Sequence, residues 1–90
     1  MILKFKAYEW DGNNVSHILN HAVSPNEVEE ACYDNPLIFR GKESRYLVYG
    51  RSGAGRYLFI ALADKGHGVV RVITARDMED KDRKLYNRKK

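Results

Sequence analysis

His21 and four arginines are the residues of this chain best suited to chemistry on a phosphodiester. The arginines lie at the ends of predicted β-strands or within them, at Arg45, Arg56, Arg71 and Arg76. RNA cleavage without a metal needs a base for the 2′-hydroxyl, an acid for the leaving 5′-oxygen and cations for the pentavalent phosphate. Imidazole titrates closest to neutral pH and guanidinium forks match phosphate oxygens. In that chemistry His21, Arg71 and Arg76 would be catalytic, and all four arginines would bind phosphate.

Arg71 is the most informative of the arginines. It occupies a mid-strand position between Val69 and Ile73, on a face that is otherwise apolar in sequence. A charge at such a position must either reach a groove or find a partner such as Glu9 or Glu30. The sequence leaves both interpretations open, a phosphate-binding arginine or a structural ion pair.

The other candidates also have structural alternatives. His21 near the end of a helix could serve only to cap its last carbonyls. Arg76 precedes the last predicted helix, whose exposed amides could also help to bind phosphate. Tyr86 is a further candidate that could place a phenol in the cleft, or could simply anchor a helix with few apolar residues. His67 lies in a predicted tight turn and is expected to be exposed.

The charge of the chain is divided unevenly along its length. Residues 1–36 hold two basic and six acidic residues, a formal charge of −4, whereas residues 37–90 hold fourteen basic and six acidic residues, a formal charge of +8. A basic half rich in predicted strands suits a polyanionic partner such as nucleic acid. Composition alone leaves open whether the protein cuts that partner or only binds it.

Length and cysteine content limit the class of protein. Ninety residues suffice for a single small domain, 1–90. The lone cysteine, Cys32, allows no internal disulfide and suits a reducing compartment. No cysteine or histidine spacing resembles a zinc site, so no metal or other cofactor is expected. The start of the chain lacks the apolar run of a signal peptide and no segment reaches transmembrane length, so we expect a cytoplasmic protein without membrane partners.

The acidic half predicts one strand and two helices. Apolar and basic residues alternate over Ile2–Tyr8, which predicts a half-buried edge strand. Asp11 can cap a first helix that ends near His21. The apolar face of that helix should comprise Val15, Ile18, Leu19 and Ala22, which follow helical spacing.

The second helix has the best-specified start in the chain. Ser24 is the expected N-cap, Pro25 takes the first helical position, and Glu27 completes a capping box. Val23 and Val28 are spaced as a hydrophobic staple across this start. The helix should stop at Asn35-Pro36 and bury Val28, Ala31 and Cys32.

The basic half predicts four strands and a final helix. The strands are expected at Leu37–Phe39, Tyr46–Tyr49, Tyr57–Leu62 and Val69–Ala75, and the helix over Asp77–Lys90. Short connections make the last three strands antiparallel neighbours, and the apolar Tyr57–Leu62 segment should be central. The fold class is therefore α+β, with an antiparallel sheet of about four to five strands. On such a sheet the arginines would form one phosphate-binding wall opposite His21.

A series of short motifs resembles the BrnT toxin family. The motifs follow one another in the family's order over nearly the whole chain: Tyr8-Glu9-Trp10-Asp11, His21-Ala22-Val23-Ser24, Asp34-Asn35-Pro36, Arg45, Gly50-Arg51-Ser52, Gly55-Arg56, and the strand from Arg71 to Arg76 before a helix with Arg83 and Tyr86. Two positions depart from the family's pattern. Asn20 stands where lysine is common and Ala22 stands where glycine is common.

The resemblance implies a RelE-like ribonuclease toxin of a type II toxin–antitoxin system. Such toxins cleave RNA without metal, often arrest translation, and are neutralised by a small antitoxin that usually carries a ribbon-helix-helix domain. An alternative is a non-catalytic module of the same fold that binds RNA or protein, a degenerate toxin. Asn20 and the expected absence of a second histidine near the cleft-forming strands favour that alternative, and a purely partner-binding domain is a third hypothesis.

Overall fold

Five strands and three helices make up the computed structural model, which describes residues 5–90. The predicted strand residues 2–4 lie outside the described part. In chain order the elements are β1 (Ala7–Glu9), α1 (Gly12–Leu19), α2 (Pro25–Tyr33), β2 (Leu37–Arg40), β3 (Arg45–Arg51), β4 (Tyr57–Gly66), β5 (Val69–Asp77) and α3 (Asp80–Lys89). Each strand and helix thus matches a predicted one, and the α+β class with a C-terminal helix is confirmed.

The strands form one sheet in the order β1-β5-β4-β3-β2. Strands β2 to β5 are antiparallel neighbours, and β4 is central, as predicted. The edge position predicted for the first strand is also confirmed, but β1 runs parallel to β5, so the sheet is mixed. Parallel pairing needs a long connection, which the two helices and three strands between β1 and β5 provide.

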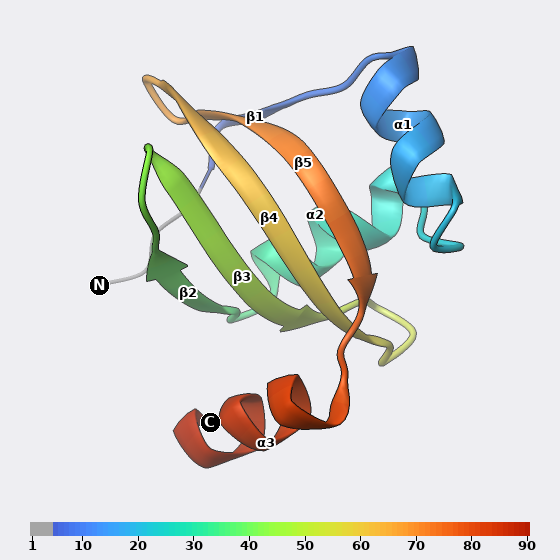
Figure 1. The fold of residues 1–90 in the computed structure, drawn as a ribbon, viewed down its shortest axis with the longest axis vertical. Helices are drawn as coiled ribbons and strands as arrows, with labels where there is room; N and C mark the ends of the chain where they lie inside the picture. The colour runs from blue at the N-terminus through green and yellow to red at the C-terminus, as the bar shows by residue number, and fades with distance from the viewer. Residues whose placement is uncertain (1–4) are drawn as a thin grey trace.

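The helices lie on different sides of the sheet (Figure 1). Helix α2 covers one face against β3 and β4, α1 flanks β5, and α3 lies across the end of the opposite face. The core lies under α2, where Leu58, Ile60 and Leu62 alternate along β4 and are fully buried. Gly50 lets α2 approach the sheet, because a Cβ there would lie 2.4 Å from the carbonyl oxygen of Ala31.

The predicted helix starts are confirmed. Asp11 accepts hydrogen bonds from the backbone N–H groups of Asn13 and Asn14, and Ser24 and Glu27 form the capping box. Helix α1 ends at Leu19, two residues before His21. Its apolar face is narrower than predicted, since Leu19 is 58% exposed while Ile18 is fully buried. The reason is that this short helix flanks the sheet beside β5 and is covered along a single line.

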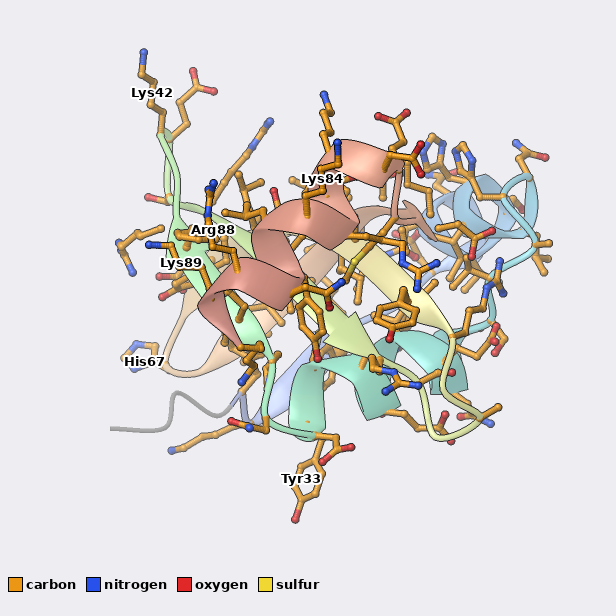
Figure 2. All side chains as sticks on the ribbon, turned by 90° about the horizontal axis from the view of Figure 1, so that it is seen from below. Tyr33, Lys42, His67, Lys84, Arg88 and Lys89 are labelled. Carbon is orange, nitrogen blue, oxygen red and sulfur yellow. The ribbon has the colours of Figure 1, made fainter. Side chains whose placement is uncertain are left out.

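Helix α3 carries most of its charge away from the sheet. Figure 2 shows Lys84, Arg88 and Lys89 pointing outward from α3, while Tyr33 projects from α2 on the opposite side of the molecule. The inward side of α3 is held by aromatic contacts. The ring of Tyr86 packs edge-on against Tyr57, with centroids 5.9 Å apart, and the guanidinium of Arg83 lies 4.1 Å from the Tyr57 ring centre.

Candidate active site

The turn that carries His21 is tied to the sheet through Arg56. His21 is exposed and follows α1, and its backbone N–H donates to the carbonyl of Ile18. The guanidinium of Arg56 donates to two carbonyls of this turn, from Nη2 to His21 at 3.2 Å and from Nη1 to Ala22 at 2.6 Å. Ala22 has a φ of 57°, a left-handed conformation that glycine adopts at less cost. The backbone under His21 is therefore fixed.

Arg56 also contacts two carboxylates. Its Nε lies 2.7 Å from Asp77 Oδ1 at the end of β5, and its Nη1 lies 3.2 Å from Glu27 Oε1 in the first turn of α2. The guanidinium holds the pKa of the Asp77 carboxyl below its usual value. The pKa of Glu27 is also lowered, first by the backbone N–H of Ser24 and then by Arg56. Arg56 thus joins the His21 turn, α2 and the end of β5.

A second histidine, His17, lies beside His21. The two ring centroids are 5.6 Å apart, and His17 Nε2 lies within hydrogen-bond distance of Thr74 Oγ1, at 3.0 Å. The expectation that no second histidine lies near the cleft-forming strands is therefore wrong, because α1 flanks β5. The sequence carries a signal for this, since the predicted first helix ends near His21 and residues four apart in a helix share one side.

Helix α1 is anchored to β5 by a buried amide. Asn14 is 5% exposed, and its side-chain nitrogen donates to the carbonyls of Glu9, at 2.8 Å, and Val72, at 3.1 Å. The bond to Glu9 joins α1 to β1, and the bond to Val72 joins α1 to β5 two residues before Thr74, beyond the segment Val69–Arg71 that pairs with β1. Asn14 thereby fixes the height of α1 along β5, and with it the position of His17.

Arg76 lies two residues beyond Thr74 on β5. Its Nη1 donates to Asp82 Oδ2 of α3 at 2.9 Å and to the carbonyl of Asp77 at 3.0 Å, and its guanidinium lies 4.5 Å from the Phe59 ring centre. Burial raises the pKa of Asp82, but bonds from Glu79 N–H and Arg76 outweigh it, so the pKa lies below the usual value. Arg76 Nε and Nη2 make no hydrogen bond within residues 5–90.

Arg71 is held between two carboxylates. Its guanidinium lies 2.8 Å from Asp11 and 3.1 Å from Glu9. The pKa of Asp11 is lowered, chiefly by the hydrogen bond from Arg71. The ion pair with Glu9 that was one of the two interpretations is present, whereas Glu30 instead accepts from the backbone of Gly53. The catalytic role of Arg71 stays a prediction.

The four arginines fall into two groups at opposite ends of the sheet. Arg45 and Arg71 both pair with Ala63 across the strands, whereas Arg56 precedes Tyr57 at the other end of β4. Arg71 and Arg76 are five residues apart on β5, which corresponds to roughly 16 Å at about 3.3 Å per residue. The single wall opposite His21 is therefore wrong as a geometric expectation, because the strand register separates the side chains.

Arg45 and Tyr86 have contrasting surroundings. Arg45 is exposed at the start of β3, and its side chain has no hydrogen bond or ion pair to the residues that the structure describes. Tyr86 is half-buried against Tyr57, and burial raises its pKa. The contact with Tyr57 matches the packing interpretation of Tyr86.

No three histidine, cysteine, aspartate or glutamate side chains within residues 5–90 are placed to hold a metal ion. None of the three helices is both long enough and apolar enough to span a membrane.

Comparison with known families matches the region that contains these groups. A family described as "Ribonuclease toxin, BrnT, of type II toxin-antitoxin system" matches residues 10–82. The match includes His17, His21 and the four candidate arginines, but it ends before Tyr86. No curated protein matches the chain. Since the match covers most of its length, the chain belongs to the BrnT family of ribonuclease toxins of type II toxin–antitoxin systems, as its motifs predicted.

Proposed function

We propose that this protein is a metal-independent endoribonuclease that cleaves RNA in the cytoplasm and so inhibits translation. The observation that carries the proposal is the position of His21, exposed on a turn that Arg56 ties to Asp77 at the end of β5. An accessible imidazole near neutral pH can move a proton at an RNA 2′-hydroxyl or 5′-oxygen. Family membership supports RNA as the substrate.

The four arginines would have different roles. We assign the reacting phosphate to Arg76, whose Nε and Nη2 N–H groups are available to stabilise charge on its oxygens. Arg56 would hold the turn that carries His21. Arg71 would chiefly hold β1 and the start of α1 together through Glu9 and Asp11. Arg45, exposed at the other end of the sheet, would contact a flanking phosphate of the same RNA.

A type II toxin has an antitoxin as its partner. We propose that this antitoxin is of the ribbon-helix-helix type and that its binding keeps the ribonuclease inactive. Adding purified antitoxin should abolish RNA cleavage in proportion to the amount of complex formed. Cleavage by a saturated complex at the rate of the free toxin would contradict this part of the proposal.

Cleavage of RNA in EDTA tests the proposal. The purified protein should cut RNA with or without the chelator, and His21→Ala should lower the rate by about 100-fold or more, the usual contribution of a general acid or base. His67→Ala is the matched control, because His67 is exposed on the β4–β5 turn, away from α1 (Figure 2). Intact RNA after prolonged incubation, or full activity of His21→Ala, would refute the proposal.

The alternative of a degenerate toxin predicts a different result. Such a protein would bind RNA with an affinity that falls steeply as salt rises, but would not turn it over. Ala22 in the strained turn and Asn20 beside His21 are the departures that favour this outcome. A purely partner-binding domain would show neither cleavage nor affinity for RNA.

A further inference from the structure

We propose that His17 is a second catalytic residue, and that His17 and His21 together carry the two proton transfers of RNA cleavage. The inference rests on the proposed ribonuclease function and adds to it a residue of the same site. It comes from the pairing of the two rings, 5.6 Å apart at an interplanar angle of 67°, on the exposed surface beside β5.

Cleavage without metal requires two proton transfers on different oxygens. The 2′-oxygen attacks phosphorus as its proton passes to a neutral imidazole, and the P–O5′ bond breaks as a protonated imidazole gives its proton to the 5′-oxygen. The products are a 2′,3′-cyclic phosphate and a 5′-hydroxyl, and the two imidazoles have exchanged protonation states. Imidazole is the one side chain whose ordinary pKa allows both roles near neutral pH. One histidine alone leaves one of the two transfers to a side chain of less suitable pKa or to water.

Both rings are carried by backbone that is fixed to the same strand. The buried amide of Asn14 bonds α1 to Val72, and His17 then bonds to Thr74. The turn of His21 is bonded to Arg56, which in turn contacts Asp77. Thr74 to Asp77 is therefore the common support, and Arg76 lies within it. Both histidines are thus linked to the same short stretch of β5 that carries Arg76.

A purely structural His17 would have a different signature. Its bond to Thr74 is exposed, and the ring is outside the core, so removing the imidazole should change stability little. A structural role predicts a small loss of stability with RNA cleavage unchanged. A catalytic role predicts that RNA cleavage is lost while stability is nearly unchanged.

Two substrates separate the roles of the two histidines. Single-turnover rates are measured on a short RNA and on a uridine 3′-(4-nitrophenyl phosphate), whose phenolate leaves without a proton. The proteins are wild type, His17→Ala, His21→Ala and the control His67→Ala. His17→Gln is added because it keeps a hydrogen-bonding group for Thr74 but transfers no protons. Thermal unfolding of each variant verifies that it is folded.

The proposal predicts that His17→Ala, His17→Gln and His21→Ala each lose about 100-fold or more on RNA, whereas His67→Ala matches wild type. On the activated substrate, the variants of only one of the two histidines should regain most of the rate, which identifies that histidine as the acid. The wild-type pH–rate profile should be bell-shaped, and each single variant should lose one limb. Folded His17 variants within about threefold of wild type on RNA would overturn the proposal.

The proposal would also be overturned if the activated substrate restored the rate of the variants of both histidines, or of neither. The proposed function fails separately, because that failure shows as wild type and His67→Ala both leaving RNA and the activated substrate uncut. If His21→Ala lost activity but the His17 variants did not, the proposed ribonuclease function would stand and His17 would have no part in its mechanism.

Discussion

The two ends of strand β5 hold an arginine between two carboxylates, with different consequences. At the β1 end, Arg71 joins Glu9 to Asp11 and so fastens an edge strand to the start of α1. At the α3 end, Arg56 joins Glu27 to Asp77 and also binds the carbonyls of the turn that carries His21. The same ion-pair arrangement thus serves cohesion at one end and, in our proposal, the positioning of reactive groups at the other.

The difference between the ends shows that an arginine's type and strand position do not determine its role. Three of the four arginines, Arg56, Arg71 and Arg76, are engaged by carboxylates. Of these three only Arg76 has both Nε and Nη2 without a hydrogen bond to residues 5–90, and it lies two residues from Thr74, which contacts His17. What distinguishes the α3 end is the convergence of α1, its following turn and β5. Variants at the two ends of β5 test this difference.

The largest expected effect is on catalysis at Arg76. Arg76→Lys keeps a cation for the buried Asp82 but loses the fork that can hold two phosphate oxygens. We expect the single-turnover rate on RNA to fall by about 100-fold, as for the removal of a charge-stabilising donor. The unfolding free energy should change far less than in Arg76→Ala, which leaves Asp82 buried without its partner. A rate within threefold of wild type would exclude Arg76 from phosphate binding.

The next effect is on stability at Arg56. Arg56→Ala removes bonds to two carbonyls and two carboxylates from a side chain that is only 26% exposed. We expect a loss of about 2 kcal/mol in urea unfolding, together with reduced RNA cleavage because the His21 turn is released. Arg71→Ala is the matched variant and should lose less, because Arg71 bonds two partly exposed carboxylates but no backbone carbonyl. Equal losses at the two positions would contradict the comparison.

Acid should weaken the contribution of Arg56 to stability. Because the pKa values of Asp77 and Glu27 are lowered in the folded state, the unfolded chain binds more protons in this range and stability rises with pH. That contribution is complete above the ordinary values of 3.8 and 4.5 and is lost as pH falls through the lower folded values. The stability difference between wild type and Arg56→Ala should therefore shrink as the pH is lowered. A difference independent of pH would show that the carboxylates contribute little.

The smallest effect is expected at Ala22. Glycine relieves the left-handed strain at a φ of 57°, so Ala22→Gly should stabilise the protein by about 0.5–1 kcal/mol. Urea unfolding measures the change, and RNA cleavage should be retained because Arg56 still binds the turn. Destabilisation by glycine would indicate that the turn gains more from restricted backbone freedom than it loses to strain.

Local features of this fold could be predicted from the sequence, whereas the site could be predicted only in part. The caps at Asp11 and Ser24 depend on residues within one helical turn, so the sequence predicts them. The burial of Leu58, Ile60 and Leu62 follows from the two-residue period of a strand, so it too can be predicted. The parallel pairing of β1 and the contact of His17 with Thr74 join segments about sixty residues apart. No local pattern encodes them.

The ion pairs of the arginines could likewise be predicted only in part. An ion pair for Arg71 with Glu9 could be anticipated, because a charge in a strand needs a partner. The sequence predicts its second partner, Asp11, only as a helix cap, whereas in the structure Asp11 both caps α1 and pairs with Arg71. Strand register, which decides that Arg45 and Arg71 lie far from His21, follows from turn geometry that the sequence specifies weakly.

The most direct test of the difference between the two ends is the RNA cleavage rate of folded Arg71→Gln. This change removes the charge that joins Glu9 to Asp11 while leaving the histidines and Arg76 untouched. Our account predicts a lower unfolding free energy and a single-turnover rate within about threefold of wild type. A folded Arg71→Gln protein that has lost cleavage by 100-fold or more would make Arg71 catalytic and contradict the division between the two ends of β5.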